Sequence, residues 1–161
     1  MGSRQTRLNL TAAALASLAA AAVALAVRLA EPFEHGVWLV AYLVLVGFLA
    51  QLLVGRGQTA LLVAASLPAP PRRTRLTQAV LWNVGVVAVP VGVLAETRLA
   101  VVAGSISLIA ALVSLARTAR PGLTAARARR WWQGCGYGVL LATMTASTLI
   151  GTALAWDIPW T

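Results

Sequence analysis

Five stretches of the chain run for 18 to 22 residues without a charged side chain, and they constrain the fold more than any other feature. They are Leu8–Val27, Val37–Val54, Leu76–Ala95, Leu99–Ala116 and Cys135–Trp156. A helix needs about 20 mostly apolar residues to cross the hydrocarbon core of a bilayer. Every backbone N–H and C=O must be paired inside lipid, and the stretches lack the alternation of barrel strands. The sequence therefore predicts an all-α, polytopic integral membrane protein, with five transmembrane helices in a single membrane domain over residues 1–161.

The composition agrees with this class. Hydrophobic residues make up 60% of the chain and charged residues 11%, whereas a soluble domain carries about 25% charged residues. A soluble globular domain is therefore excluded, and the lone Cys135 excludes a disulfide-stapled secreted fold. Arg4 and Arg7 ahead of the first stretch would also suit a secretory signal peptide. The apolar run of 20 residues exceeds the roughly 7–15 of a signal core, which favours a retained helix.

The segment Gly55–Pro71 allows two interpretations. Its apolar part, Thr59–Leu67, is too short to span a bilayer, and Arg56 separates it from the second stretch. The favoured interpretation is that the second helix continues beyond the membrane core, with Arg56 reaching the lipid headgroups. Pro68, Pro70 and Pro71 would then stop that helix, because proline lacks the N–H and clashes with the preceding turn. The alternative is a short helix lying on the membrane.

The charges predict the orientation. If the N-terminus is cytoplasmic, eleven of the thirteen arginines fall on the inner side with no acidic residue, and the outer segments hold two arginines and all four acids. The net charge of +9 is then an inner face of +11 against an outer face of −2. Arginine-rich short loops stay in the cytoplasm, so we expect a cytoplasmic N-terminus and an outer C-terminus in the cell membrane.

His35 is the only histidine, and it lies in a polar segment at the predicted outer end of the second helix. Neutral imidazole binds metals and titrates near neutral pH, so His35 is a candidate axial ligand of haem or copper, or a pH-sensitive contact. Met144 lies near the middle of the fifth stretch, too deep to share one haem with a residue at the rim. The competing interpretation is an ordinary histidine in an interfacial loop.

The third stretch contains the most irregular features. Pro90 removes one helical hydrogen bond, so a kink is expected there. Asn83 lies seven residues earlier on about the same face, and Gln51 is at a similar distance from the inner side. Gln51, Asn83 and Pro90 could therefore line a small polar pocket. Ordinary hydrogen bonding between helices is the alternative.

Small residues form rows on the fourth and fifth stretches. The rows consist of Gly104, Ser107, Ala111 and Ser114, and of Ser147, Gly151 and Ala155. Small side chains let helix backbones approach closely in lipid. We expect packing inside the molecule, with contact to another subunit as the alternative.

A basic segment follows the fourth stretch and is expected to be an inner loop broken by Pro121 and Gly122. Its charges are Arg117, Arg120, Arg127, Arg129 and Arg130. Each would attract anionic lipid of the inner leaflet by about 1 kcal/mol. Nucleic-acid binding is not expected, because no soluble fold presents these side chains.

No Asp, Glu, His, Lys or Arg lies inside any stretch, and the chain has no metalloprotease, nucleophile-elbow, P-loop or CxxC motif. Catalysis is therefore not expected. The leading hypothesis is an accessory or assembly subunit of a larger membrane complex, in contact with other membrane subunits or with copies of itself. Two alternatives stay open. One is a haem, metal or small-ligand binder that uses His35 or the Asn83–Pro90 region, and the other is an oligomeric channel or carrier.

Overall fold

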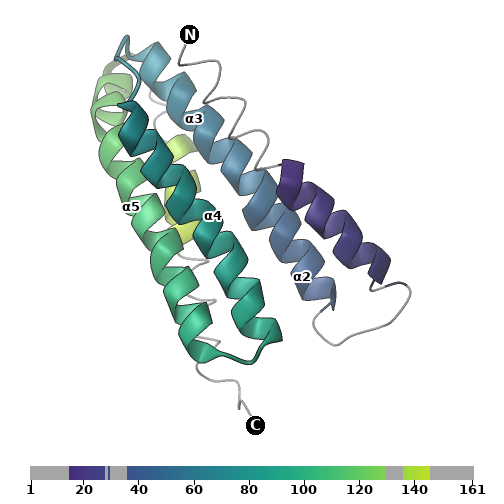
Figure 1. The fold of residues 1–161 in the computed structure, drawn as a ribbon. Helices are drawn as coiled ribbons and strands as arrows, with labels where there is room; N and C mark the ends of the chain where they lie inside the picture. Colours follow the sequence, from purple (N-terminus) through teal and green to yellow (C-terminus); the bar gives the residue numbers. More distant parts are fainter. Residues whose placement is uncertain (1–14, 28, 30–35, 130–135, 146–161) are drawn as a thin grey trace. The chain divides into compact units, whose positions relative to one another are not determined.

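The computed structural model describes residues 15–27, 29, 36–129 and 136–145, with side chains except at 125–129. The described residues form helices and short connections, without a strand (Figure 1). Three helices are long and apolar enough to cross a membrane: Gly36–Ala64, Arg72–Leu94 and Arg98–Thr124. The first and fifth predicted spans are represented by the shorter apolar helices Leu15–Val27 and Gly136–Thr145. The all-helical class is thus confirmed for these residues, and they contain three helices of spanning length.

The chain divides into two compact units, Met1–Leu53 and Val54–Thr161. The first unit contains the helix Leu15–Val27, α2 (Gly36–Tyr42), the π-helix η1 (Leu43–Ala50) and the start of α3 (Gln51–Ala64). The segments α2, η1 and α3 follow one another without a break as the 29-residue helix Gly36–Ala64. The second predicted helix therefore continues beyond Val54, as the favoured interpretation of Gly55–Pro71 required.

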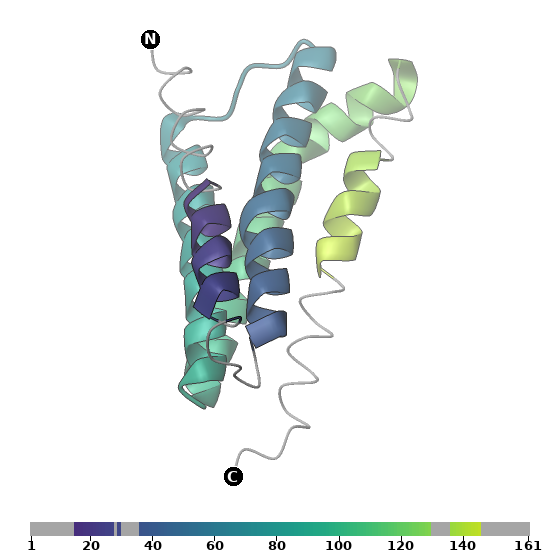
Figure 2. The same ribbon diagram turned by 90° about the vertical axis from the view of Figure 1, so that its right-hand side faces the viewer.

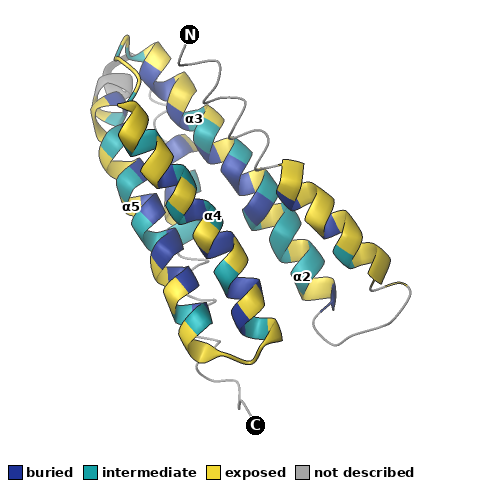
Figure 3. Ribbon diagram, viewed as in Figure 1, coloured by how far each residue is buried: buried dark blue, intermediate teal, exposed yellow. Residues whose placement is uncertain are grey.

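The second unit is built around an antiparallel pair, α4 (Arg72–Leu94) and α5 (Arg98–Arg129), which lie side by side along their length in Figure 1. Only Ala95, Glu96 and Thr97 connect them. Buried and exposed positions alternate along both helices at helical spacing (Figure 3). Buried side chains of α4 such as Trp82, Val86 and Val89 form the core with those of α5 such as Leu108 and Leu112. The core of this unit therefore lies along the contact between the two helices.

Glycine allows the backbones of α4 and α5 to approach closely. A Cβ atom added to Gly85 would lie 2.8 Å from the carbonyl oxygen of Gly104, and one added to Gly92 would lie 2.6 Å from the backbone nitrogen of Val101. A Cβ atom on Gly104 would lie 2.9 Å from the backbone nitrogen of Val89. Close approach is how helices gain packing energy in lipid. The lipid tails are as apolar as the side chains, so the hydrophobic effect does not drive the helices together. The pair is thus held by direct backbone proximity.

Helices α3 and α4 end in the same way. At the end of α3, the backbone N–H of Leu67 donates to the carbonyl of Leu62, and that of Ser66 donates to the carbonyl of Val63. At the end of α4, the backbone N–H of Thr97 donates to the carbonyl of Gly92, and that of Glu96 donates to the carbonyl of Val93. This is the Schellman arrangement, whose penultimate residue adopts left-handed backbone geometry and is usually glycine. Here these residues are Ser66, with φ of 54°, and Glu96, with φ of 51°. The Schellman turn ends α3 before the first of the prolines, which follow in the connection to α4.

Two prolines lie inside helices. Pro90 is buried within α4, which continues past it to Leu94. Pro121 lies within α5, which continues to Arg129, so the expectation of a loop broken at Pro121 and Gly122 is wrong. The physical reason is packing: Gly122 is buried, and its position faces the side chains of Leu61 and Leu62 on α3. The last part of α5 leans away from the direction of its first part (Figure 2), as expected where a proline removes a helical hydrogen bond.

Candidate functional site

A cluster of uncharged polar side chains joins three helices of the second unit. The Gln58 amide nitrogen on α3 donates to the Thr118 hydroxyl on α5 over 2.6 Å. The Gln78 amide nitrogen on α4 donates to the same hydroxyl over 3.0 Å and to the Ser114 hydroxyl over 3.3 Å. Gln58 and Gln78 are 7% and 6% exposed. We call Gln58, Gln78, Ser114 and Thr118 the amide–hydroxyl cluster.

Thr118 is the centre of this cluster because every hydrogen-bonding position of its hydroxyl is occupied. Its oxygen accepts from both glutamine amides, and its O–H donates to the backbone carbonyls of Ser114 and Leu115, with Oγ1 3.0 Å from each carbonyl oxygen. A hydroxyl has one donor and two acceptor positions, so all three are occupied. None of these groups ionises near neutral pH. The cluster therefore holds three helices together by hydrogen bonds and offers no acid or base for catalysis.

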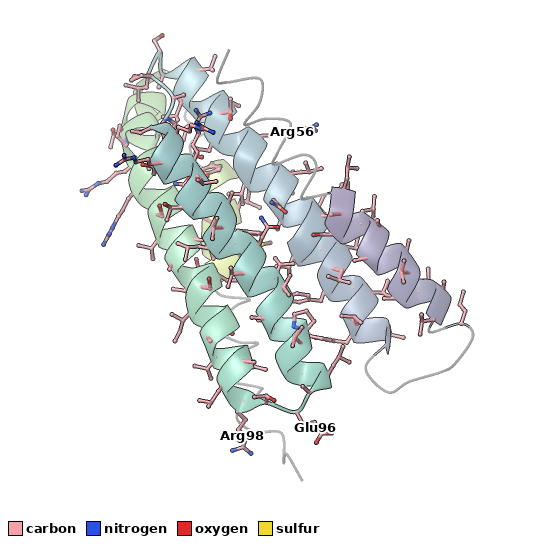
Figure 4. All side chains as sticks on the ribbon, in the orientation of Figure 1. Arg56, Glu96 and Arg98 are labelled. Atoms are coloured by element: carbon pink, nitrogen blue, oxygen red, sulfur yellow. The ribbon has the colours of Figure 1, made fainter. Side chains whose placement is uncertain are left out.

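Arginines surround the end of the second unit at which this cluster lies. They are Arg56 on α3, Arg72, Arg73 and Arg75 on α4, and Arg117 and Arg120 on α5; all but Arg75 are exposed. We call these six residues the basic end. Because α4 and α5 are antiparallel, Glu96 and Arg98 lie at the opposite end of the pair, at the turn labelled in Figure 4. Among the described residues of the unit, the acidic residue Glu96 is thus separated from the basic end by the length of α4.

The first turn of α4 concentrates positive charge. Arg72, Arg73 and Arg75 belong to this turn, which contains no acidic residue, and its N-cap residue Pro71 makes no side-chain hydrogen bond. The N-terminus of a helix carries a partial positive charge, so cations there are unfavourable by about 0.3–1 kcal/mol each. An anionic partner, such as a lipid phosphate, would offset this repulsion.

The predicted pocket residues are placed as follows. Asn83 on α4 donates its amide N–H to the backbone carbonyl of Ala79 over 2.8 Å, one turn earlier in its own helix. Pro90 is buried in the same helix. Gln51 belongs to the first unit and is 6% exposed, and its amide nitrogen and oxygen have no hydrogen-bond partner among the described residues. Asn83 is thus satisfied locally, whereas Gln51 is not.

The small-residue row of α5 faces α4. Gly104 packs against Ala88 and Val89, and the Ser107 hydroxyl donates to the backbone carbonyl of Leu81 over 2.8 Å. Ala111 has no exposed surface, and Ser114 belongs to the amide–hydroxyl cluster. The row is therefore occupied by contacts inside the second unit.

The remaining predicted site residues lie outside the described part of the chain. These are His35, Arg130, Ser147 and Gly151, and, for their side chains, Arg127 and Arg129. Arg117 and Arg120 are described and exposed. No group of three or more histidine, cysteine, aspartate or glutamate side chains that could hold a metal ion is present among the described residues.

Sequence reasoning missed the amide–hydroxyl cluster. Gln58 and Thr118 lie beyond the ends of the predicted spans, next to arginines, where polar residues are expected to face headgroups and water. The available signal was the spacing: Ser114 and Thr118 are four residues apart, which places them on one helical face. Comparison with protein families, curated proteins and solved structures finds no match for the chain.

Proposed function

We propose that this protein is a multi-pass protein of the cell membrane and a non-catalytic accessory or assembly subunit of a larger membrane complex. The observation that supports assembly most directly is an apolar stripe on the outer face of α4. It consists of Val80, Val84, Val87, Val91 and Leu94, each 51 to 61% exposed. Their spacing of four, three, four and three residues is the repeat by which a second helix packs along a seam.

The use of the other polar and small groups supports the same proposal. The small-residue row of α5 and the amide–hydroxyl cluster are engaged within the second unit, through bonds such as Ser107 to Leu81 and Gln58 to Thr118. Among the exposed apolar residues, the regular stripe of α4 is the surface that we propose for a partner helix. We propose another membrane helix as its partner, supplied by a different subunit or by a second copy.

Site-specific photo-crosslinking tests the stripe in intact membranes. A photoreactive residue at Val84 or Val87 should give a discrete crosslinked product heavier than the monomer. The matched control is Ile106 on α5, which is 60% exposed but is not part of the stripe. Gentle solubilisation should also yield the chain together with a partner. A lone monomer, with no crosslink from the stripe beyond that from the control, would refute the proposal.

We further propose five spans, with the N-terminus and the basic end in the cytoplasm. The separation of the basic end from Glu96 along α4 supports this orientation. In a variant with Cys135→Ser, a cysteine introduced at position 35 should react with an impermeant reagent from outside. A cysteine at position 127 should react only after the inner side is opened. The reverse pattern would contradict the orientation.

Anionic lipids are the proposed partners of the basic end. Phosphatidylglycerol should raise the melting temperature of the purified protein more than phosphatidylcholine does, since each arginine near the surface contributes about 1 kcal/mol. Arg72→Gln with Arg73→Gln should reduce this difference. Arg98→Gln, at the opposite end, should leave it unchanged. Equal stabilisation by the two lipids would remove this part of the proposal.

A further inference from the structure

Gln51 is the least satisfied polar side chain of the described residues. It is 6% exposed, and neither its amide nitrogen nor its amide oxygen has a hydrogen-bond partner there. Buried polar groups in folded proteins are paired almost without exception, because an unpaired group loses its hydration and gains nothing. Gln58, seven residues later in the same helix, is equally buried but donates to Thr118. The unpaired amide of Gln51 therefore requires an explanation that Gln58 does not.

The backbone is unusual at the same place. Residues Leu43–Ala50 form the π-helix η1, with Tyr42 as its N-cap and Gln51 as its C-cap. Single π turns are rare, and they occur frequently at functional sites. The Tyr42 hydroxyl is also buried without a partner among the described residues, and its ring stacks on Trp38 with the centroids 5.3 Å apart. Both ends of η1 thus carry an unsatisfied polar group.

We propose that Gln51 binds the hydroxyl group of an uncharged guest beside η1. The amide offers N–H donors and a carbonyl acceptor, and a hydroxyl accepts from the one and donates to the other. A charged guest does not fit, because Gly36–Val54 contains no ionisable side chain other than Tyr42 to neutralise it, and the most apolar 18 residues of its helix have a mean hydropathy of 2.5. The hydroxyl comes from an ordered water molecule or from a lipid-soluble alcohol or phenol.

The Tyr42 hydroxyl is a separate hydrogen-bonding point. Nine residues separate Tyr42 from Gln51, which is an axial rise of about 13.5 Å at 1.5 Å per residue. The proposal concerns Gln51, and it is independent of the proposed assembly function, since it requires no partner helix.

Nuclear magnetic resonance of the full chain in lipid nanodiscs tests the proposal without a substitution. With ¹⁵N-labelled glutamine, the side-chain amide of Gln51 is assigned by its loss in Gln51→Met. Its protons should show cross-relaxation to water, or else to protons of a retained small molecule. In the second case native mass spectrometry should show an adduct that Gln51→Met loses and Gln58→Met keeps. Contacts to protein and lipid acyl chains alone would overturn the proposal.

Thermal unfolding gives a second readout, because the melting temperature of Gln51→Met should change in opposite directions depending on whether Gln51 is paired. If Gln51 holds a hydroxyl, Gln51→Met removes a satisfied hydrogen bond and should lower the melting temperature by about 2–4 °C. If the amide is unpaired, the same variant removes a buried polar group and should raise the melting temperature, which would contradict the proposal. Gln58→Met is the control, and it should lower the melting temperature because Thr118 loses a donor.

Discussion

Gly85 lies where the backbones of α4 and α5 approach closely, and Gly85→Ala tests whether this approach holds the pair together. The added Cβ atom would lie 2.5 Å from Leu108 Cγ and 2.8 Å from the carbonyl oxygen of Gly104. Ordinary contact begins at 3.4 Å, so the distance to the Gly104 oxygen is 0.6 Å too short. The Leu108 side chain could turn away, but a backbone oxygen inside a helix cannot. The two helices must therefore separate locally.

The size of the effect follows from this displacement. A radial gap of about 0.5–1 Å forfeits a quarter to a half of the attraction between facing atoms, and overpacking a well-packed interior destabilises by about 1–3 kcal/mol. Separation would also lengthen the 2.8 Å bond from the Ser107 hydroxyl to the carbonyl of Leu81, one turn from Gly85. Alanine has a higher helix propensity than glycine, and this offsets the loss of stability by up to about 1 kcal/mol. We expect a net loss of about 2 kcal/mol in the free energy of unfolding.

The assay is reversible unfolding in mixed micelles with a rising fraction of denaturing detergent, followed by far-ultraviolet circular dichroism. Gly138→Ala is the matched control, because a Cβ atom at Gly138 would meet nothing within 4 Å. This control should gain up to about 1 kcal/mol from helix propensity alone. The two variants should thus differ by about 3 kcal/mol. Gly85→Ala that is as stable as Gly138→Ala would refute the reasoning, because the backbones would then not be in contact.

Two further predictions use the same assay. A double-mutant cycle of Gln58→Leu and Thr118→Val should show a coupling of about 0.6–1.7 kcal/mol, the range measured between membrane helices, and additive effects would contradict the 2.6 Å bond. Glu96→Gly should raise the free energy of unfolding by about 1 kcal/mol, because glycine adopts the left-handed geometry of the turn without strain, and a loss of stability would show that the Glu96 side chain has another role.

Hydrophobic patterning predicted the existence of the long helices, because the requirement for paired backbone groups in lipid leaves little choice of structure. The apolar runs are shorter than the helices that contain them. The predicted third span began at Leu76 and the fourth ended at Ala116, whereas α4 begins at Arg72 and α5 ends at Arg129. Arginine and alanine are good helix formers, so the helices continue where the apolar run stops.

The candidate site was harder to predict, because it depends on contacts between helices. Gln51 and Asn83 share the same amide chemistry in the sequence, yet Asn83 bonds to its own helix and Gln51 has no hydrogen-bond partner among the described residues. Gln78 and Thr118 meet only because the turn at Glu96 sets the register of α4 against α5. Spacing along one helix contains no information about that register.

The three-residue connection between α4 and α5 also bears on how the protein is made. A link of Ala95, Glu96 and Thr97 leaves neither helix the slack to enter a bilayer without the other. In the proposed orientation Glu96 and Arg98 must cross the bilayer, at whose centre a charged side chain costs about 2.5–3.5 kcal/mol. Joint insertion of the hairpin lets the apolar surface of both helices drive the transfer of both charges. We therefore expect the translocation machinery to release α4 and α5 into the membrane together, as one preformed hairpin.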